Sequence, residues 1–171
     1  MEPKVCKDSR VTQTILVFPN ELNHYQTMFG GSLMAHIDMV ATLSAIRHSR
    51  TTSVTASTDS VDFLCPITQN DSVCLESYVT WTGKSSMEVF VKVVAEDLFT
   101  GERRIATTSF LTFVALDKNK KPVQIPQVIP ETEEEKKLHE TALDRAKMRK
   151  LRKEESKNLA SHLTTKKYWD N

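Results

Sequence analysis

The chain reads Asn23-His24-Tyr25-Gln26-Thr27-Met28-Phe29-Gly30-Gly31-Ser32-Leu33-Met34-Ala35-His36-Ile37-Asp38 where a polar loop meets an apolar helical run. Two of the four glycines in the chain stand side by side here. Glycine permits close approach to the backbone, and a helix start offers free N–H groups and partial positive charge. Asp38 follows Gly31 by seven residues, about two helical turns, so it points to nearly the same side. Oxyanion donors and a carboxylate that activates water would share one helix, a layout suited to acyl-group hydrolysis.

Hydrophobic periodicity predicts one strand before this helix and four after it. The helix spans about 32–50, and the strands span 10–18, 52–64, 73–82, 86–97 and 104–116. Short turns between the last three strands predict antiparallel hairpins. The helix is apolar nearly all round, which is typical of a buried helix. One long buried helix against one antiparallel sheet predicts an α+β fold.

The C-terminal region has a different composition. A Lys/Pro-rich connection leads to Thr132-Glu133-Glu134-Glu135, a capping-box pattern that predicts a charged helix to about Leu159. Its apolar stripe is thin, and acidic residues interleave with its bases, so we expect a solvated helix face and not an RNA-binding surface. Those bases are Lys147, Arg149, Lys150, Arg152 and Lys153. We divide the chain into a main domain, 8–125, and a linker with a charged helical tail, 126–171.

Composition narrows the functional classes. The chain has 171 residues and a net charge of +1, which gives no general attraction to nucleic acid or membrane. Three cysteines without paired spacing indicate reduced thiols in a cytoplasmic protein. The N-terminus lacks the apolar core of a secretory signal, and no apolar run approaches about 20 residues. We expect no metal site, because the histidines share no ligand spacing: His24, His36 and His48.

Several motifs, in order, carry a family resemblance. The first group of motifs consists of Asn23, Phe29-Gly30-Gly31, Leu33-Met34 and Ile37-Asp38. Later segments fit the same family pattern, at 53–57, 61–63, 66–67, 83–89, 113–117 and 128–133. Together they resemble the acyl-CoA hydrolases of the hotdog superfamily over roughly Arg10 to the mid-130s. Gln26 stands where that family often has Gly.

The resemblance implies a hotdog fold, a long central helix wrapped by an antiparallel sheet, with a C-terminal helical extension. It implies an acyl-CoA thioesterase of fatty acid metabolism that needs no cofactor beyond the coenzyme A of its substrate. Asp38 would be the general base or nucleophile, Gly31 the oxyanion donor, and Asn23 a positioning group from the other subunit. A homodimer would be the minimal unit and a hexamer, a trimer of dimers, the assembly. The implied substrate and CoA contacts are Gly30, Thr55, Ser57, Lys84, Ser85 and Ser86.

Other interpretations stay open from the sequence. A non-catalytic acyl-CoA-binding or sensing module would keep the pocket without needing Asp38, but it would usually carry a DNA-binding segment, and none is evident. A hotdog dehydratase fits the motifs less well. A serine-triad hydrolase is disfavoured because no Gly-x-Ser-x-Gly elbow occurs. A phosphate-binding loop at Gly83-Lys84-Ser85 fails because Tyr78 stands where the loop needs glycine.

Overall fold

The computed structural model describes residues 1–170. Besides two short 3-10 helices, Cys6–Ser9 and Pro19–Glu21, it contains seven strands and three α-helices. In chain order they are β1 (Lys4–Val5), β2 (Val11–Leu16), α1 (Gly30–Ser49), β3 (Thr52–Phe63), β4 (Asp71–Thr82), β5 (Ser86–Asp97), β6 (Arg103–Leu116), β7 (Val128–Ile129), α2 (Glu133–Glu140) and α3 (Ala142–His162). The predicted strand–helix–four-strand order is confirmed, with boundaries within about two residues.

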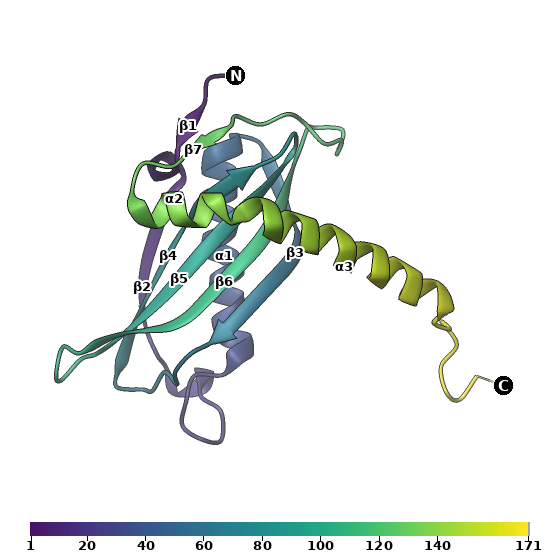
Figure 1. Cartoon of the computed structure of the whole chain (residues 1–171). Helices are drawn as coiled ribbons and strands as arrows, with labels where there is room; N and C mark the ends of the chain where they lie inside the picture. Colours follow the sequence, from purple (N-terminus) through teal and green to yellow (C-terminus); the bar gives the residue numbers. More distant parts are fainter. Residues whose placement is uncertain (171) are drawn as a thin grey trace.

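Five strands form one antiparallel sheet in the order β2-β4-β5-β6-β3. The sheet curves around α1 on one face, and α2 and α3 cross the other face (Figure 1). β1 and β7 pair in parallel as a small separate sheet that joins the N-terminal segment to the connection between β6 and α2. The α+β class and the hotdog arrangement are therefore confirmed. β3 is an edge strand along its whole length.

The α1 face of the sheet is the apolar core. Alternate residues of β5 are fully buried there, as the period-two pattern predicts: Met87, Val89, Val91, Val93 and Ala95. They pack under one side of α1, where the buried apolar residues are Leu33, Ile37, Val40, Ala41 and Ala45. The expectation that α1 is buried all round is wrong for the single chain. The sheet covers only one side, and Met34, Met39, Leu43 and Ile46 are 41–50% exposed.

The outer face of the sheet is covered by two helices where the sequence predicts one. The capping box is confirmed, since the Thr132 side chain accepts from the Glu135 amide and Glu135 reaches back to Thr132. The helix breaks at Thr141, whose hydroxyl donates to the Lys137 carbonyl. The Arg145 guanidinium donates to the Leu138 carbonyl at 2.6 Å, so a side chain takes up a carbonyl that the break frees.

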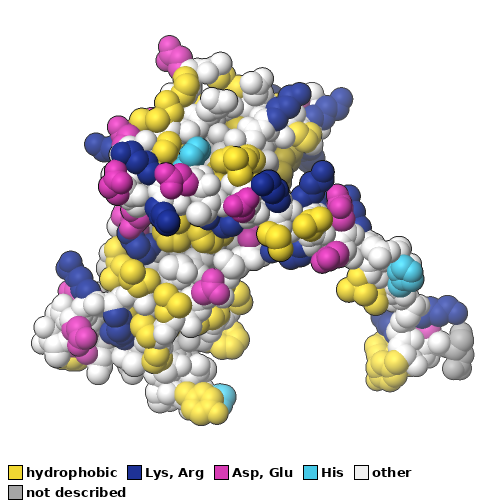
Figure 2. All heavy atoms as spheres, in the orientation of Figure 1, with side chains coloured by type: hydrophobic (Ala, Val, Ile, Leu, Met, Phe, Trp, Pro, Cys, Tyr) yellow, Lys and Arg dark blue, Asp and Glu magenta, His cyan; other side chains and the backbone are white. Residues whose placement is uncertain are grey.

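Basic and acidic side chains alternate along α2 and α3 on this surface (Figure 2). The far part of α3 extends past the edge of the sheet (Figure 1), and its residues from Lys150 onward are exposed. No helix within residues 1–170 is both long and apolar enough to cross a membrane.

Candidate active site

Helix α1 begins at the paired glycines, and no side chain from the described part of the chain caps its first turn. The N–H groups of that turn are therefore free to donate to an external acceptor. A Cβ at Gly31 would lie 2.6 Å from Cε1 of Phe29, and one at Gly30 would lie 3.3 Å from Cζ of Phe63. Neither glycine has a left-handed φ. Glycine at these two positions lets the rings of Phe29 and Phe63 lie close against the backbone.

Asp38 and Thr55 form the polar pair of this face. The Thr55 hydroxyl, on β3, donates to Oδ1 of Asp38 at 2.8 Å. Asp38 is partly buried, as its apolar neighbours in the sequence predict, and Thr55 is exposed at the sheet edge. A carboxylate that accepts one hydrogen bond keeps further lone pairs for a water molecule. The family resemblance implies a substrate contact for Thr55, and in the single chain its hydroxyl bonds Asp38.

Asn23 is held by its own loop. Its Oδ1 accepts from the amides of Tyr25 at 2.9 Å and Thr27 at 3.2 Å, and its Nδ2 donates to the Thr27 hydroxyl at 2.9 Å. Within residues 1–170 Nδ2 makes that one hydrogen bond, so its second N–H can still donate. Asn23 and Asp38 of the same chain are not hydrogen-bonded to each other. The structure thus fixes the orientation of the Asn23 amide and leaves one donor for another group.

The loop around Asn23 has a left-handed residue. Gln26 has a φ of 61°, and its amide donates to the Asn23 carbonyl at 3.0 Å. A non-glycine residue in this conformation carries a steric cost. Gln26 therefore adopts the backbone conformation that glycine would take most easily, and the loop closes without glycine.

The other predicted substrate contacts lie in a different place. Ser57 and Ser86 line a cavity of about 490 Å³ between α3 and the outer face of the sheet, together with Trp81. Lys84 and Ser85 lie in the β4–β5 hairpin beside this cavity, and Lys84 is exposed. Gly30 instead lines a cavity of about 400 Å³ at the start of α1. Within one chain the predicted residues therefore fall into two separate groups.

Sequence reasoning missed the apolar lining of the cavity at Gly30. Leu33, Phe63 and Ile67 contribute to its wall, and it opens beside the free amides of α1. Phe63 belongs to the quoted motif 61–63, yet no role was predicted for it. An apolar hollow beside hydrogen-bond donors is typical of a small-molecule site.

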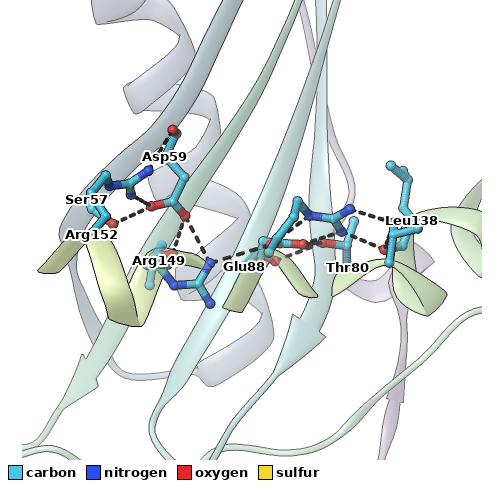
Figure 3. Close-up of polar contacts among 10 residues, drawn as sticks. Ser57, Asp59, Thr80, Glu88, Leu138, Arg149 and Arg152 are labelled. Carbon is cyan, nitrogen blue, oxygen red and sulfur yellow. Dashed lines mark hydrogen bonds and ion pairs between the residues drawn. The ribbon is translucent and has the colours of Figure 1, made fainter. Parts of the chain in front are cut away.

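Sequence reasoning also missed a ladder of charged residues between α3 and the sheet, which Figure 3 shows. Arg145 donates to both oxygens of Glu88, a residue with no exposed surface, at 2.7 and 3.0 Å. Arg149 donates to Asp59 at 3.0 Å, and Arg152 also pairs with Asp59. The prediction of a solvated basic face is therefore wrong for Arg149, whose side chain is only 13% exposed, whereas Arg152 is exposed and still pairs with Asp59. Their partners lie far away in the sequence, on β3 and β5.

The described residues contain no group of three or more His, Cys, Asp or Glu side chains placed to hold a metal ion. Burial raises the pKa of the Cys6 thiol to about 12, so this thiol is not a nucleophile at neutral pH. The free amides at the start of α1 and the Asp38 carboxylate have chemistry suited to a carbonyl substrate.

Comparison with known proteins agrees with this reading of the fold. The family profile of the thioesterase superfamily matches residues 25–100. The chain is 62% identical to an uncharacterized acyl-CoA thioester hydrolase of Bacillus subtilis over 168 residues, 98% of each chain. The chain belongs to the acyl-CoA hydrolase family of hotdog thioesterases. The predicted enzyme class is confirmed.

Two solved structures of hotdog thioesterases extend the comparison. A hexameric acyl-CoA thioesterase superposes with a TM-score of 0.87 at 49% identity, over 89% of this chain and 97% of its own. A Staphylococcus aureus acyl-CoA hydrolase, solved with butyryl coenzyme A and coenzyme A, superposes with a TM-score of 0.90 at 44% identity, over 93% and 97%. Variants of the S. aureus enzyme with one Asn, Asp or Thr replaced by Ala have also been solved.

Proposed function

We propose that this thioesterase hydrolyses fatty acyl-CoA to a free fatty acid and coenzyme A, with Asp38 as the general base. The observation that carries the proposal is the pairing of Asp38 with Thr55, two helical turns from the uncapped start of α1. In the S. aureus variants the replaced Asn, Asp and Thr are separated by 15 and 17 positions, and Asn23, Asp38 and Thr55 are separated by the same intervals. This match supports the choice of residues.

The chemistry assigns a task to each group. Asp38 takes a proton from a water molecule as its oxygen attacks the thioester carbonyl carbon. The Gly31 N–H donates to the carbonyl oxygen as it becomes an oxyanion, where the helix dipole also favours negative charge. The C–S bond then breaks, coenzyme A leaves as the thiolate, and the proton held by Asp38 returns to it. Direct attack by the Asp38 carboxylate is the less favoured route, because it would form an anhydride that must then be hydrolysed.

A second copy of the chain completes the site. The free edge of β3 can pair with the same strand of a partner in a two-fold dimer, a common way to protect a sheet edge. Antiparallel pairing would bring the Phe63 end of one β3 beside the Thr52 end of the other. At one end of β3, Gly30 lies against Phe63. At the other end, the Ser85 carbonyl accepts a hydrogen bond from the amide of Ala115, the cross-strand partner of Ser53.

The two groups of predicted residues would therefore meet across the dimer. The glycines of one copy would face the β4–β5 hairpin of the other, where Lys84 would bind a phosphate of coenzyme A and Ser85 and Ser86 would donate hydrogen bonds to it. The free N–H of Asn23 from one copy would orient water or substrate at the partner copy's carboxylate. Three such dimers would form a hexamer like that of the related thioesterase.

Release of free thiol from saturated acyl-CoAs of graded chain length tests the proposal. We expect saturable turnover, with the preferred length set by the apolar cavity at Gly30. Acyl-CoA that binds in calorimetry without any thiol release at any chain length would contradict the proposal and favour the non-catalytic sensing module.

A further inference from the structure

Strand β3 contains two bulges close to the Asp38–Thr55 pair. Its register against β6 shifts between Thr55 and Ser57 and again between Thr58 and Ser60, so Ala56 and Asp59 are extra residues. Bulges bend a strand and re-aim side chains, and they are frequent beside active sites. The Thr55 hydroxyl, which donates to Asp38, therefore lies directly before the irregular segment 56–59. The position of this segment decides where the hydroxyl lies.

The first bulge changes the face to which the strand points its side chains. In a regular strand, Thr55 and Ser57 would lie on the same face. Here Thr55 reaches α1, where it bonds Asp38, while Ser57 donates to Asp59 at 2.6 Å on the α3 side. The segment between the two bulges is thus joined to α1 by one hydroxyl and to α3 by the next.

Asp59 gathers the contacts that hold this segment. Its Oδ1 accepts from Ser57 and Arg152, and its Oδ2 accepts from Thr112 at 2.6 Å and Arg149 at 3.0 Å. Thr112 is the partner of Ser57 on β6, so one carboxylate ties both sides of the ladder after the first bulge. Arg152 also donates to the Asp59 backbone carbonyl at 3.0 Å, which satisfies an acceptor at the second bulge.

The anchor on α3 is largely buried. The Asp59 and Arg149 side chains are only 11% and 13% exposed, so their attraction is little screened by salt. The Arg149 guanidinium also lies 3.6 Å from Oε2 of the buried Glu88 (Figure 3). Glu88 in turn accepts two hydrogen bonds from Arg145. These directional contacts fix the rotation of α3 about its axis and its position over β3.

We infer that Asp59, held by Arg149 and Arg152, is a positioning residue for the hydrolytic site. It fixes the bulged segment of β3 so that the Thr55 hydroxyl stays within hydrogen-bond reach of Asp38. The inference rests on the proposed thioesterase function and adds the C-terminal helix to its machinery. Displacement of a catalytic group by about 1 Å can cost on the order of 100-fold in rate, so loss of the anchor acts on turnover.

The first test compares two substitutions at ion pairs of α3. Asp59→Asn keeps the size of the side chain and weakens both arginine contacts, and we expect kcat to fall about 10- to 100-fold with little change in KM. Arg152→Ala, at a half-exposed position, should lower kcat less, and Arg152→Lys should recover part of the loss. Lys147→Ala removes only the exposed pair with Asp144 and should leave kcat unchanged. An Asp59→Asn enzyme with normal kcat overturns the inference.

A double-mutant cycle distinguishes positioning from a general loss of structure. If Asp59 acts through Thr55, Asp59→Asn should have almost no further effect on kcat in a Thr55→Ala background. Losses that multiply would show that Asp59 acts independently of Thr55, which overturns the inference.

Amide hydrogen exchange at Ser57, which pairs with Thr112 across the ladder directly after the first bulge, gives a readout that does not depend on activity. We expect exchange about tenfold faster or more in Asp59→Asn and unchanged exchange in Lys147→Ala. Unchanged exchange in Asp59→Asn overturns the positioning role even if the wild-type chain proves inactive. Absence of thiol release from the wild type would instead refute the proposed function.

Discussion

The two faces of the sheet are held to their helices by different physics. On the α1 face, fully buried side chains such as Ile37 and Val40 pack on alternate strand residues, and the attraction is non-directional. On the α3 face, Glu88 and Asp59 receive the hydrogen bonds of three arginines, and α3 itself buries only Ala142 completely. Apolar packing thus holds α1, the helix of the candidate catalytic residue, whereas directional ion pairs fix α3 on the opposite face of the sheet.

The largest expected effect lies on the α1 face. Asp38→Asn keeps the side-chain size but cannot take a proton from water, so kcat should fall about 10²- to 10⁴-fold. Binding of a non-hydrolysable acyl-CoA thioether should stay nearly unchanged in calorimetry. Near-normal turnover in this variant would remove Asp38 as the base and leave the α1 face with a structural role only.

The next effect tests the charged face. Arg145→Met leaves the buried Glu88 without its bidentate partner, and the free energy of unfolding should fall by about 3 to 5 kcal/mol. The double variant with Glu88→Leu should recover most of this loss, because no buried charge remains. Urea denaturation measures both variants. If the free energy of unfolding falls by less than about 1 kcal/mol in the single variant, the Arg145–Glu88 pair contributes no more than an ordinary exposed salt bridge.

A pH-dependent effect follows at Glu135, which anchors α2. Burial raises its pKa, but hydrogen bonds from the Thr132 and Glu131 amides and from Arg10 outweigh burial and hold the pKa below the ordinary value of 4.5. The stability that this carboxylate contributes is therefore full above about pH 4.5 and is lost as the pH falls through the folded-state pKa.

Glu135→Gln should lower the free energy of unfolding by about 1 to 2 kcal/mol at pH 7, and the difference from wild type should shrink at pH 3. Denaturant titrations at the two pH values measure it. A difference that stays constant with pH would show that the amide-to-carboxylate contacts do not depend on charge.

The smallest effect concerns the loop that leads into α1. Gln26 holds a left-handed φ, so Gln26→Val should cost about 1 to 2 kcal/mol relative to Gln26→Gly. Thermal denaturation of the two variants side by side gives the difference. Equal stabilities would indicate that the loop before α1 can rearrange, and would weaken the claim that it fixes Asn23.

The sequence predicts the core strand of the α1 face well, because alternation along β5 leaves a clear periodic signal. It does not predict which side of α1 the sheet leaves uncovered, since the helix is apolar nearly all round. It does not predict the bulges at Ala56 and Asp59, since one extra residue leaves no mark in a polar strand. Nor does it predict the α3 anchor. Arg149 stands among interleaved charges that resemble a solvated face, and its partner Asp59 is 90 residues away. The break at Thr141 is hidden because threonine is tolerated within helices.

The central claim is that each hydrolytic site combines Asp38 of one chain with Asn23 of another. Co-expression of an Asp38→Asn chain with an Asn23→Ala chain tests it directly. Random pairing would make half of the dimers mixed, and each mixed dimer would hold one intact site, so about a quarter of the wild-type activity should return. A mixed preparation no more active than the two variants measured alone would show that both residues serve the same site from one chain, which contradicts the account.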